Sequence, residues 1–355
     1  MEALAPETVH RRLLAAARPA AGFDPELDLA SQRATLLARL EALLAIPESP
    51  PAIVVVERET VTAGVLERRF LVESEPGASV PCRLLVPESV ASPVPVMLCL
   101  QGHTPGMHIS LGRARNDSER ALTDGGRDFA RQALARGFAA LVVELRGFGE
   151  RADRRRAALR DPFLDLASQD PNVTCKHAAM VALLLGRTSL GEKILDLRAV
   201  LDAAASFPEV AGAPIYAIGN SGGGTLAWYA AAVEPRLAGL VLGSCFCTFA
   251  ASIGRVDHCC DNYLPGALRW FDFPDLAMLV APRPLVVVQG DEDPLFPLDG
   301  VETAFARANA IYAAAGAADR CRLLVVEGGH RFYPDTAWPA FLELLGDAAP
   351  GRRPS

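Results

Sequence analysis

Residues 214–233 read PIYAIGNSGGGTLAWYAAAV, and this stretch decides the fold of the chain. Its apolar start, residues 214–219, predicts a buried strand, and residues 222–233 predict a helix rich in small side chains. Ser221 lies between them on a sharp turn. Glycines flank such a turn because larger side chains would collide with the crossing backbone. The pattern predicts a nucleophile elbow, with Ser221 exposed above a sheet.

Apolar runs alternate with amphipathic segments along much of the remaining chain. We expect strands at residues 53–59, 65–73, 80–86, 94–100, 138–144, 214–219, 238–244, 284–290 and 321–327. We expect helices at residues 126–136, 191–206, 222–233, 299–315 and 336–345. Strands that are apolar on both faces and separated by helices predict a mostly parallel sheet covered on both sides, an α/β fold.

The domain organisation follows from where this alternation holds and where it breaks. Residues 1–49 are expected to form a helical N-terminal extension, acting as a cap or a dimer arm, which leaves a homo-oligomer open. The α/β domain should span residues 50–347, and residues 348–355 should be a frayed tail. Two long insertions, 146–190 and 245–282, are expected to act as lids or pocket walls.

Charge and hydropathy exclude several classes of partner. The net charge of −7 and pI near 5.5 leave no basic surface for nucleic acid. No apolar stretch approaches the roughly 18–20 residues that span a bilayer, and the N-terminus lacks the pattern of a secretion signal. The 8 cysteines show no even spacing, which favours reduced thiols. We therefore expect a cytoplasmic protein without nucleic-acid or membrane partners.

A serine hydroxyl needs a base and a group that orients that base. In a strand–turn–helix architecture of this kind the chain order is serine, acid, histidine, with the histidine after the last strand. Of the 6 histidines, His330 alone satisfies that order. It follows the strand at 321–327, where two glycines let the loop turn back toward the sheet.

The acid that orients the histidine should follow the strand that precedes residues 321–327 in the chain. The segment GDEDPLFP, residues 290–297, follows the apolar strand at 284–290, and Asp293 is our choice within it. Asp291 and Glu292 also remain open, because spacing does not exclude them. Further alternatives in the loop after residues 238–244 are Asp257 and Asp261.

An oxyanion would need backbone N–H donors beside the serine. Gly222 supplies the first, because it follows the nucleophile. The glycine-rich segment QGHTPG, residues 101–106, ends the strand at 94–100, and the N–H of His103 would be the second. The side chains of His103 and His108 could equally line the pocket.

A cluster of soft ligands raises a zinc site as an alternative. Its members are Cys245, Cys247, His258, Cys259 and Cys260. Their spacing does not match the usual zinc knuckles, and cysteine is a frequent core residue. Cys175 near His177 raises a thiol nucleophile, but no elbow glycine accompanies it. We therefore expect neither a metal nor an organic cofactor.

The chain resembles the α/β-hydrolase superfamily and, within it, dienelactone hydrolase and acetyl xylan esterase-like serine esterases. The resemblance spans roughly residues 50–345. It is carried by Leu100-Gln101-Gly102-His103, Arg146-Gly147-Phe148-Gly149, Gly219-Asn220-Ser221-Gly222-Gly223, Gly290 through Asp293 to Pro297, and Gly329-His330. It implies a Ser221, Asp293, His330 triad and ester hydrolysis through an acyl-enzyme. Gln101 departs from the family, which often carries histidine there, and dienelactone hydrolases proper use cysteine as nucleophile.

The expectation is a serine hydrolase that cleaves a small-molecule carboxylic ester. Small residues around the elbow, and bulky lid residues at Phe163, Leu164, Trp270 and Phe271, favour a small acyl group such as acetyl. An amidase or peptidase with the same triad is the first alternative. A noncatalytic binding protein of the same fold is the second.

Overall fold

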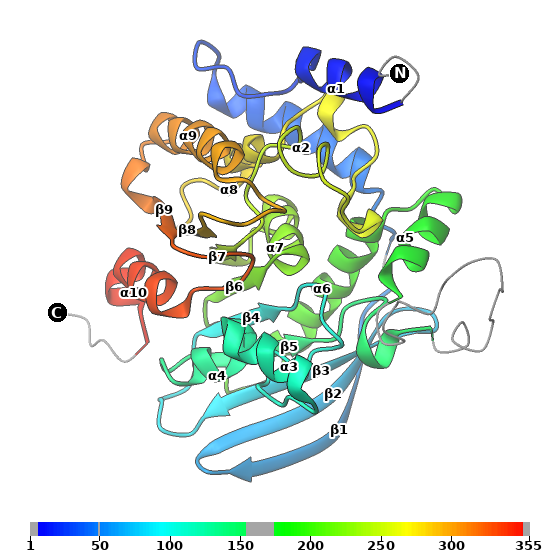
Figure 1. Ribbon diagram of the computed structural model, residues 1–355. Coiled ribbons are helices and arrows are strands. Elements are labelled where there is room, and N and C mark those ends of the chain that lie inside the picture. The colour runs from blue at the N-terminus through cyan, green and yellow to red at the C-terminus, as the bar shows by residue number, and fades with distance from the viewer. Residues whose placement is uncertain (1–5, 49, 154–173, 351–355) are drawn as a thin grey trace.

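The computed structural model describes residues 6–48, 50–153 and 174–350, and a twisted sheet forms its centre (Figure 1). The described strands form one nine-stranded sheet in the order β1-β2-β3-β5-β4-β6-β7-β8-β9. Their bounds are β1 Ile53–Thr62, β2 Val65–Glu75, β3 Ala78–Pro87, β4 Val96–Leu100, β5 Ala139–Val143, β6 Ile215–Asn220, β7 Leu237–Gly243, β8 Leu285–Gly290 and β9 Cys321–Val326.

Strand direction divides the sheet into two parts. β1, β2 and β3 pair antiparallel, and β3 pairs antiparallel with β5. From β5 through β9 every pairing is parallel. The carboxyl ends of these six strands therefore lie along one edge, where open α/β sheets bind their ligands. The predicted mostly parallel sheet is confirmed.

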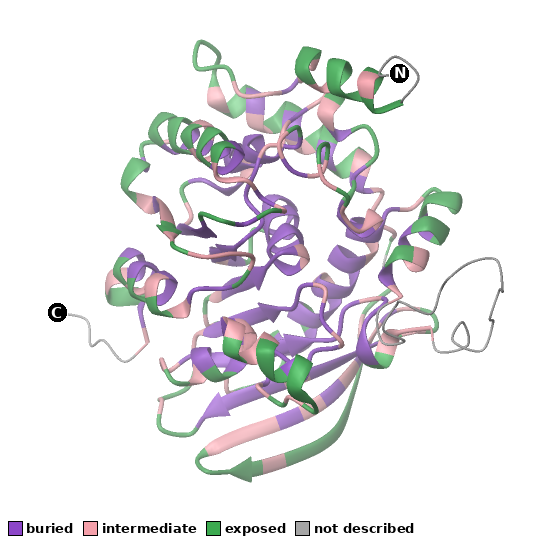
Figure 2. Ribbon diagram, in the orientation of Figure 1, coloured by how far each residue is buried: buried purple, intermediate pink, exposed green. Residues whose placement is uncertain are grey.

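Helices cover both faces of the sheet, and the buried residues follow the strands between them (Figure 2). The helices are α1 Pro6–Ala16, α2 Leu29–Leu44, α3 Asp117–Leu122, α4 Phe129–Leu134, α5 Cys175–Leu184, α6 Ser189–Ala205, α7 Gly222–Val233, α8 Ala277–Val280, α9 Leu298–Ala314 and α10 Pro334–Leu345. One core contains residues of α2, α6, α7, α8 and α9, and the other contains residues of α4 and α10. β4, β5 and β8 are buried throughout, in keeping with their largely apolar sequences.

The N-terminal segment is helical and is attached to the body by its second helix. Leu36, Leu40 and Leu44 of α2 are fully buried. Arg33 of the same helix donates to the carbonyls of Met278 (2.6 Å) and Ala281 (2.9 Å). α1 buries none of its residues. None of the helices over the described residues has the length and hydropathy that crossing a bilayer requires.

The helix expected at 126–136 is present but shorter, as α4, and the preceding helix α3 was not expected. α3 ends at Leu122 and α4 begins at Phe129, and between them Gly126 adopts φ +77°. A Cβ on Gly126 would lie 2.8 Å from the carbonyl oxygen of Phe332, so the chain turns where the loop after β9 packs against it. The expected insertion at 146–190 contains α5, which the sequence analysis did not identify. Phe163 and Leu164 lie outside the described residues.

Candidate active site

The elbow holds Ser221 in a conformation that L-residues rarely adopt. Ser221 has φ +56° and ψ −130° between β6 and α7. A Cβ on Gly219 would lie 2.5 Å from the carbonyl of Gly223, and one on Gly223 would lie 2.2 Å from the carbonyl oxygen of Leu100. The N–H of Ser221 donates to the carbonyl of Gly243 on β7 (2.9 Å). Glycine on both sides is therefore a steric requirement of this turn.

Ser221 is only 9 % exposed, so the expectation of an exposed serine is wrong. The loop after β4 closes over the elbow. A Cβ on Gly102 would lie 3.4 Å from the Cβ of Ser221 and 2.6 Å from the carbonyl oxygen of Asn220. The serine therefore lies at the floor of a covered site.

His330 and Asp293 form the hydrogen bond that a serine hydrolase needs. His330 Nδ1 lies 2.8 Å from Asp293 Oδ2. The other carboxylate oxygen of Asp293 accepts from the N–H groups of Leu295 (2.9 Å) and Phe296 (3.2 Å). Burial alone would raise the pKa of Asp293, but the hydrogen bond and charge of His330 outweigh it and lower that pKa. An ionised Asp293 holds the proton on Nδ1 and leaves the other ring nitrogen to act as a base.

The other carboxylates considered for this role are occupied elsewhere or exposed. Asp291 accepts from the N–H of Gly328 (2.9 Å), which fixes the loop that carries His330. Asp261 binds a different histidine, and Asp257 and Glu292 are exposed. In the described chain, Asp293 is the one of these candidates that contacts His330.

Neighbouring residues bring the elbow and the histidine loop together. Asn220, with its amide oriented to satisfy both partners, donates to the carbonyl of Arg331 (3.2 Å). Ser244 Oγ donates to the same carbonyl (3.0 Å). Within the described residues the Ser221 hydroxyl forms no hydrogen bond with His330. Catalytic hydrogen bonds in free enzymes are often long and tighten when substrate binds.

Two backbone amides beside Ser221 have no partner among the described residues. Gly222 is the first residue of α7, where helix N–H groups lack intrahelical acceptors. The N–H of His103 lies in the loop after β4, which packs on the elbow through Gly102. Both remain the candidate oxyanion donors expected from the sequence.

Glu144 anchors this loop, and the sequence analysis missed it. Its Oε1 accepts from Gln101 Nε2 (3.1 Å) and from the N–H of Met107 (2.9 Å), one at each end of the loop. Its Oε2 accepts from the N–H of Glu150 (3.3 Å). Burial raises the pKa of Glu144 to about 7. An acid directly after the apolar strand β5 was the available signal.

The side chain of His103 is held by a buried pair of charges. His103 Nε2 lies 3.0 Å from Asp261 Oδ1, and Lys193 Nζ lies 2.7 Å from Asp261 Oδ2. Burial alone would lower the pKa of His103, but the hydrogen bonds to Asp261 and Cys259 raise it to about 9. The ring lies against Gly222, whose added Cβ would be 2.8 Å from Cε1. His108 instead pairs with Glu119 (3.1 Å).

A small cavity of about 20 Å³, enough for one small group, lies near His330. Phe296 joins the two, since it lines the cavity and stacks on His330 with ring centroids 5.9 Å apart. The other lining residues are Thr225, Cys245, Cys247, Thr248, Phe249, Ser252, Ile253, His258, Asn262 and Phe273.

The expected wall residues Trp270 and Phe271 do not line this cavity. Phe271 is fully buried in the core. Trp270 lies beneath the guanidinium of Arg39 of α2, 4.1 Å from the ring centroid. Phe271 packs in the core, and Trp270 packs against the N-terminal helix α2. The expectation that they form a pocket wall is therefore wrong.

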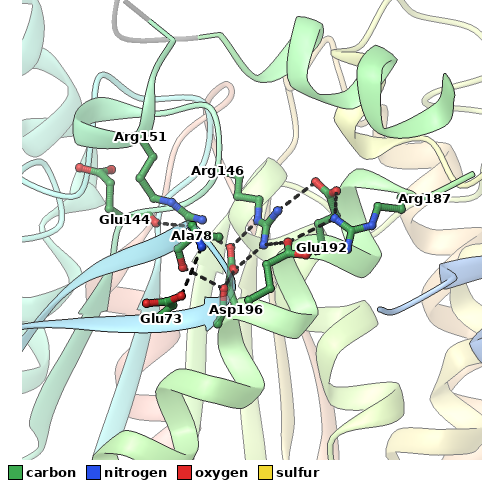
Figure 3. Close-up of polar contacts among 11 residues, drawn as sticks. Glu73, Ala78, Glu144, Arg146, Arg151, Arg187, Glu192 and Asp196 are labelled. Carbon is green, nitrogen blue, oxygen red and sulfur yellow. Dashed lines mark hydrogen bonds and ion pairs between the residues drawn. The ribbon is translucent and has the colours of Figure 1, made fainter. Parts of the chain in front are cut away.

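Arg146, part of the motif after β5, belongs to an ion network and not to the reaction centre (Figure 3). It contacts Asp196 through Nε (2.8 Å) and Glu75 through Nη2 (2.7 Å). Arg187 joins the same group by binding Glu75 (2.6 Å) and Glu192 (3.0 Å). The network fixes the loop that follows β5.

The chain is similar to a known protein family and to a bacterial relative. A model of the Abhydrolase family matches residues 3–196. A protein of Bacillus subtilis (strain 168), "Putative hydrolase YtaP", is 27 % identical over 267 residues, which cover 70 % of this chain and 77 % of that protein.

Solved structures share the fold at low sequence identity. A "putative acetyl xylan esterase" from Bacteroides fragilis NCTC 9343 aligns with TM-score 0.73 and 19 % identity over 95 % of this chain and 84 % of the other. The glucuronoyl esterase from Solibacter usitatus aligns with TM-score 0.64 and 15 % identity over 93 % of this chain and 97 % of the other. The α/β-hydrolase fold expected from the sequence is confirmed.

Proposed function

The chain belongs to the Abhydrolase family, and from that premise we propose that it is a serine esterase that cleaves a carboxylic ester through Ser221, His330 and Asp293. The observation that carries the proposal is the 2.8 Å hydrogen bond between His330 and Asp293 on the loops beside the Ser221 elbow. A histidine oriented by a carboxylate next to a strained serine is the arrangement that activates a hydroxyl.

The reaction would proceed in two halves. Ser221 Oγ attacks the ester carbonyl and its proton passes to Nε2 of His330, while the N–H groups of Gly222 and His103 stabilise the oxyanion. The C–O bond to the alcohol then breaks, and His330 gives its proton to that alcohol. Water repeats the attack on the acyl-serine with His330 as base, which releases the acid and restores Ser221. Asp293 remains ionised throughout.

The acyl group should be small, such as acetyl. The cavity beside His330 measures about 20 Å³, and Phe249, Phe273 and Phe296 form part of its lining. A chain longer than acetyl would have to displace Phe249 or Ile253, which line it. The fold neighbour named as an acetyl xylan esterase is consistent with this acyl group.

Labelling with a fluorophosphonate tests the nucleophile directly. Wild type should be labelled, and Ser221→Ala and His330→Ala should not, whereas Ser206→Ala, which alters a helix-capping serine of α6, should label as wild type does. Labelling that survives in Ser221→Ala contradicts the proposal. Absence of labelling in wild type would instead favour a noncatalytic protein.

Substrate comparison tests the bond and the acyl group. We expect p-nitrophenyl acetate to be hydrolysed faster than the butyrate and an aminoacyl anilide not to be hydrolysed. Ile253→Ala should narrow the gap between acetate and butyrate, because it widens the cavity. Faster turnover of the anilide would identify an amidase or peptidase with the same triad.

A further inference from the structure

Four metal-ligating side chains meet beneath the loop after β4. A ring nitrogen of His103, the sulfurs of Cys175 and Cys259 and a carboxylate oxygen of Asp261 all lie within 4.8 Å of one another. The two sulfurs are 3.3 Å apart, and His103 Nε2 is 3.0 Å from Asp261 Oδ1. The ligands come from three distant segments: the loop after β4, the first residue of α5 and the loop after β7.

These spacings suit a tetrahedral zinc ion. Zinc bonds of about 2.3 Å to sulfur and about 2.0–2.2 Å to nitrogen or oxygen place neighbouring ligand atoms about 3.3–3.8 Å apart. Donor atoms that all fall within 4.8 Å of one another reach that geometry by shifts of about 1 Å or less. Two thiolates with an imidazole and a carboxylate are a donor set that favours zinc over magnesium or calcium.

We propose that these four side chains bind one Zn²⁺ ion. On binding, the thiol protons of Cys175 and Cys259 pass to solvent, and the sulfurs bind the metal as thiolates. His103 binds through Nε2, so the proton that this nitrogen shares with Asp261 Oδ1 also passes to solvent, and the proton on Nδ1 remains. Asp261 binds through Oδ1, the oxygen that otherwise contacts His103.

Lys193 completes the outer shell of this site. Its Nζ lies 2.7 Å from Asp261 Oδ2, the oxygen that faces away from His103, and its side chain is only 6 % exposed. Two thiolates and a carboxylate carry one negative charge more than zinc neutralises, and the ammonium of Lys193 balances it. Such a partner orients a ligating carboxylate and stabilises the bound form.

The site is closed, which assigns it a structural role. Four protein ligands leave no position for substrate or water, unlike catalytic zinc sites. The ion would tie the loop of His103 to α5 and to the loop after β7. Gly147 permits this contact: it has φ +82°, and an added Cβ would lie 2.6 Å from the Cα of Cys175. The zinc site itself does not rest on the proposed esterase function.

This proposed site differs from what the sequence predicted. The sequence favoured no metal, and its alternative was a zinc cluster within residues 245–260. Of that cluster only Cys259 participates. Cys245, Cys247 and His258 line the small cavity, and Cys260 Sγ faces the carbonyl of Lys176. The sequence does not show which loops fold together at the edge of the sheet, so it cannot identify His103 and Cys175 as partners of Cys259.

Metal binding is tested on the full chain under reducing conditions. The protein is stripped with a chelator, Zn²⁺ is added back, and bound zinc is measured by mass spectrometry after gel filtration. We expect one zinc per chain. Co²⁺ should give the intense thiolate-to-cobalt absorption and the visible bands of a tetrahedral site. Because both readouts use wild type, they decide the question even if a variant fails to fold.

Variants then assign the ligands. Cys259→Ser and Cys175→Ser should each weaken zinc binding by at least about tenfold. The adjacent Cys260→Ser is the matched control and should bind as wild type does. No zinc or cobalt signal in wild type, an equal loss in Cys260→Ser, or a Cys175–Cys259 disulfide in the reduced sample would overturn the proposal. Fluorophosphonate labelling of Ser221 reports on the esterase proposal separately.

Discussion

At Ser221 the backbone is held at φ +56°, a region that costs a non-glycine residue of order 1–3 kcal/mol. The surrounding contacts determine this conformation. Its N–H is bonded to Gly243, and Gly102, Gly219 and Gly223 allow three backbone segments to meet at the turn. The strained conformation of Ser221 therefore depends on the glycines around it, because larger side chains there would collide with the neighbouring backbone.

The proposed role of Asp293 predicts a large kinetic effect with little structural change. Asp293→Asn keeps the size of the side chain but can hold the imidazole in the wrong tautomer. We expect kcat to fall by about 10³–10⁴ while the folded structure is retained. Steady-state kinetics with p-nitrophenyl acetate measure the effect. Asp291→Asn, which alters only the contact with Gly328, is the control and should lose far less activity.

Glu144 predicts a dependence of stability on pH. Its pKa is raised by burial from 4.5 to about 7 in the folded protein. The folded state therefore binds the proton more tightly than the unfolded state, and this group's contribution to stability is lost as pH rises from about 4.5 to about 7. Glu144→Gln removes that loss. The free energy of unfolding of the variant minus that of wild type should therefore be larger at pH 8 than at pH 5.

Urea unfolding at several pH values measures this difference. Glu302→Gln, on the exposed side of α9, is the control, and its profile should run parallel to that of wild type. A parallel profile for Glu144→Gln as well would show that the carboxyl of Glu144 does not change its proton affinity on folding.

At the scale of single elements, α2 is attached to the body by one row of leucines. Leu36, Leu40 and Leu44 are fully buried. Leu40→Ala should lower the free energy of unfolding by about 2–5 kcal/mol, because it leaves a cavity in the core. Leu13→Ala, in α1 where the side chain is largely exposed, should change it by less than about 0.5 kcal/mol. Denaturant unfolding that shows equal losses would contradict this view of α2.

The sequence predicts an element well where its own period decides the structure. β4 and most of β8 are apolar runs, and the elbow has a local signature, so all three follow from neighbouring residues. The turn at Gly126, which separates α3 from α4, does not, because the residue that it packs against, Phe332, lies far along the chain. The same reason hides the partners of Glu144 and of His103, which only the folded sheet edge brings together.

At the scale of the whole molecule, an ion network joins α6 to β2 and to the segment after β5. Asp196 of α6 accepts from Ser74 Oγ (2.5 Å) on β2, and from Arg146 (2.8 Å) and Arg151 (2.7 Å) in the segment after β5 (Figure 3). Its side chain is 1 % exposed. Burial alone would raise the pKa of Asp196, but the charges of Arg151 and Arg146 hold it below its ordinary value.

Asp196→Asn should therefore destabilise the protein far more than the loss of a surface pair. The substitution leaves Arg146 and Arg151 largely buried with too little negative charge, which costs about 3–5 kcal/mol. Glu343→Gln breaks the exposed pair with Arg322 and should cost at most about 1 kcal/mol. Chemical denaturation of both variants measures the contrast. Equal effects would mean that solvent screens the Asp196 network, and that the loop after β5 is fixed by packing alone.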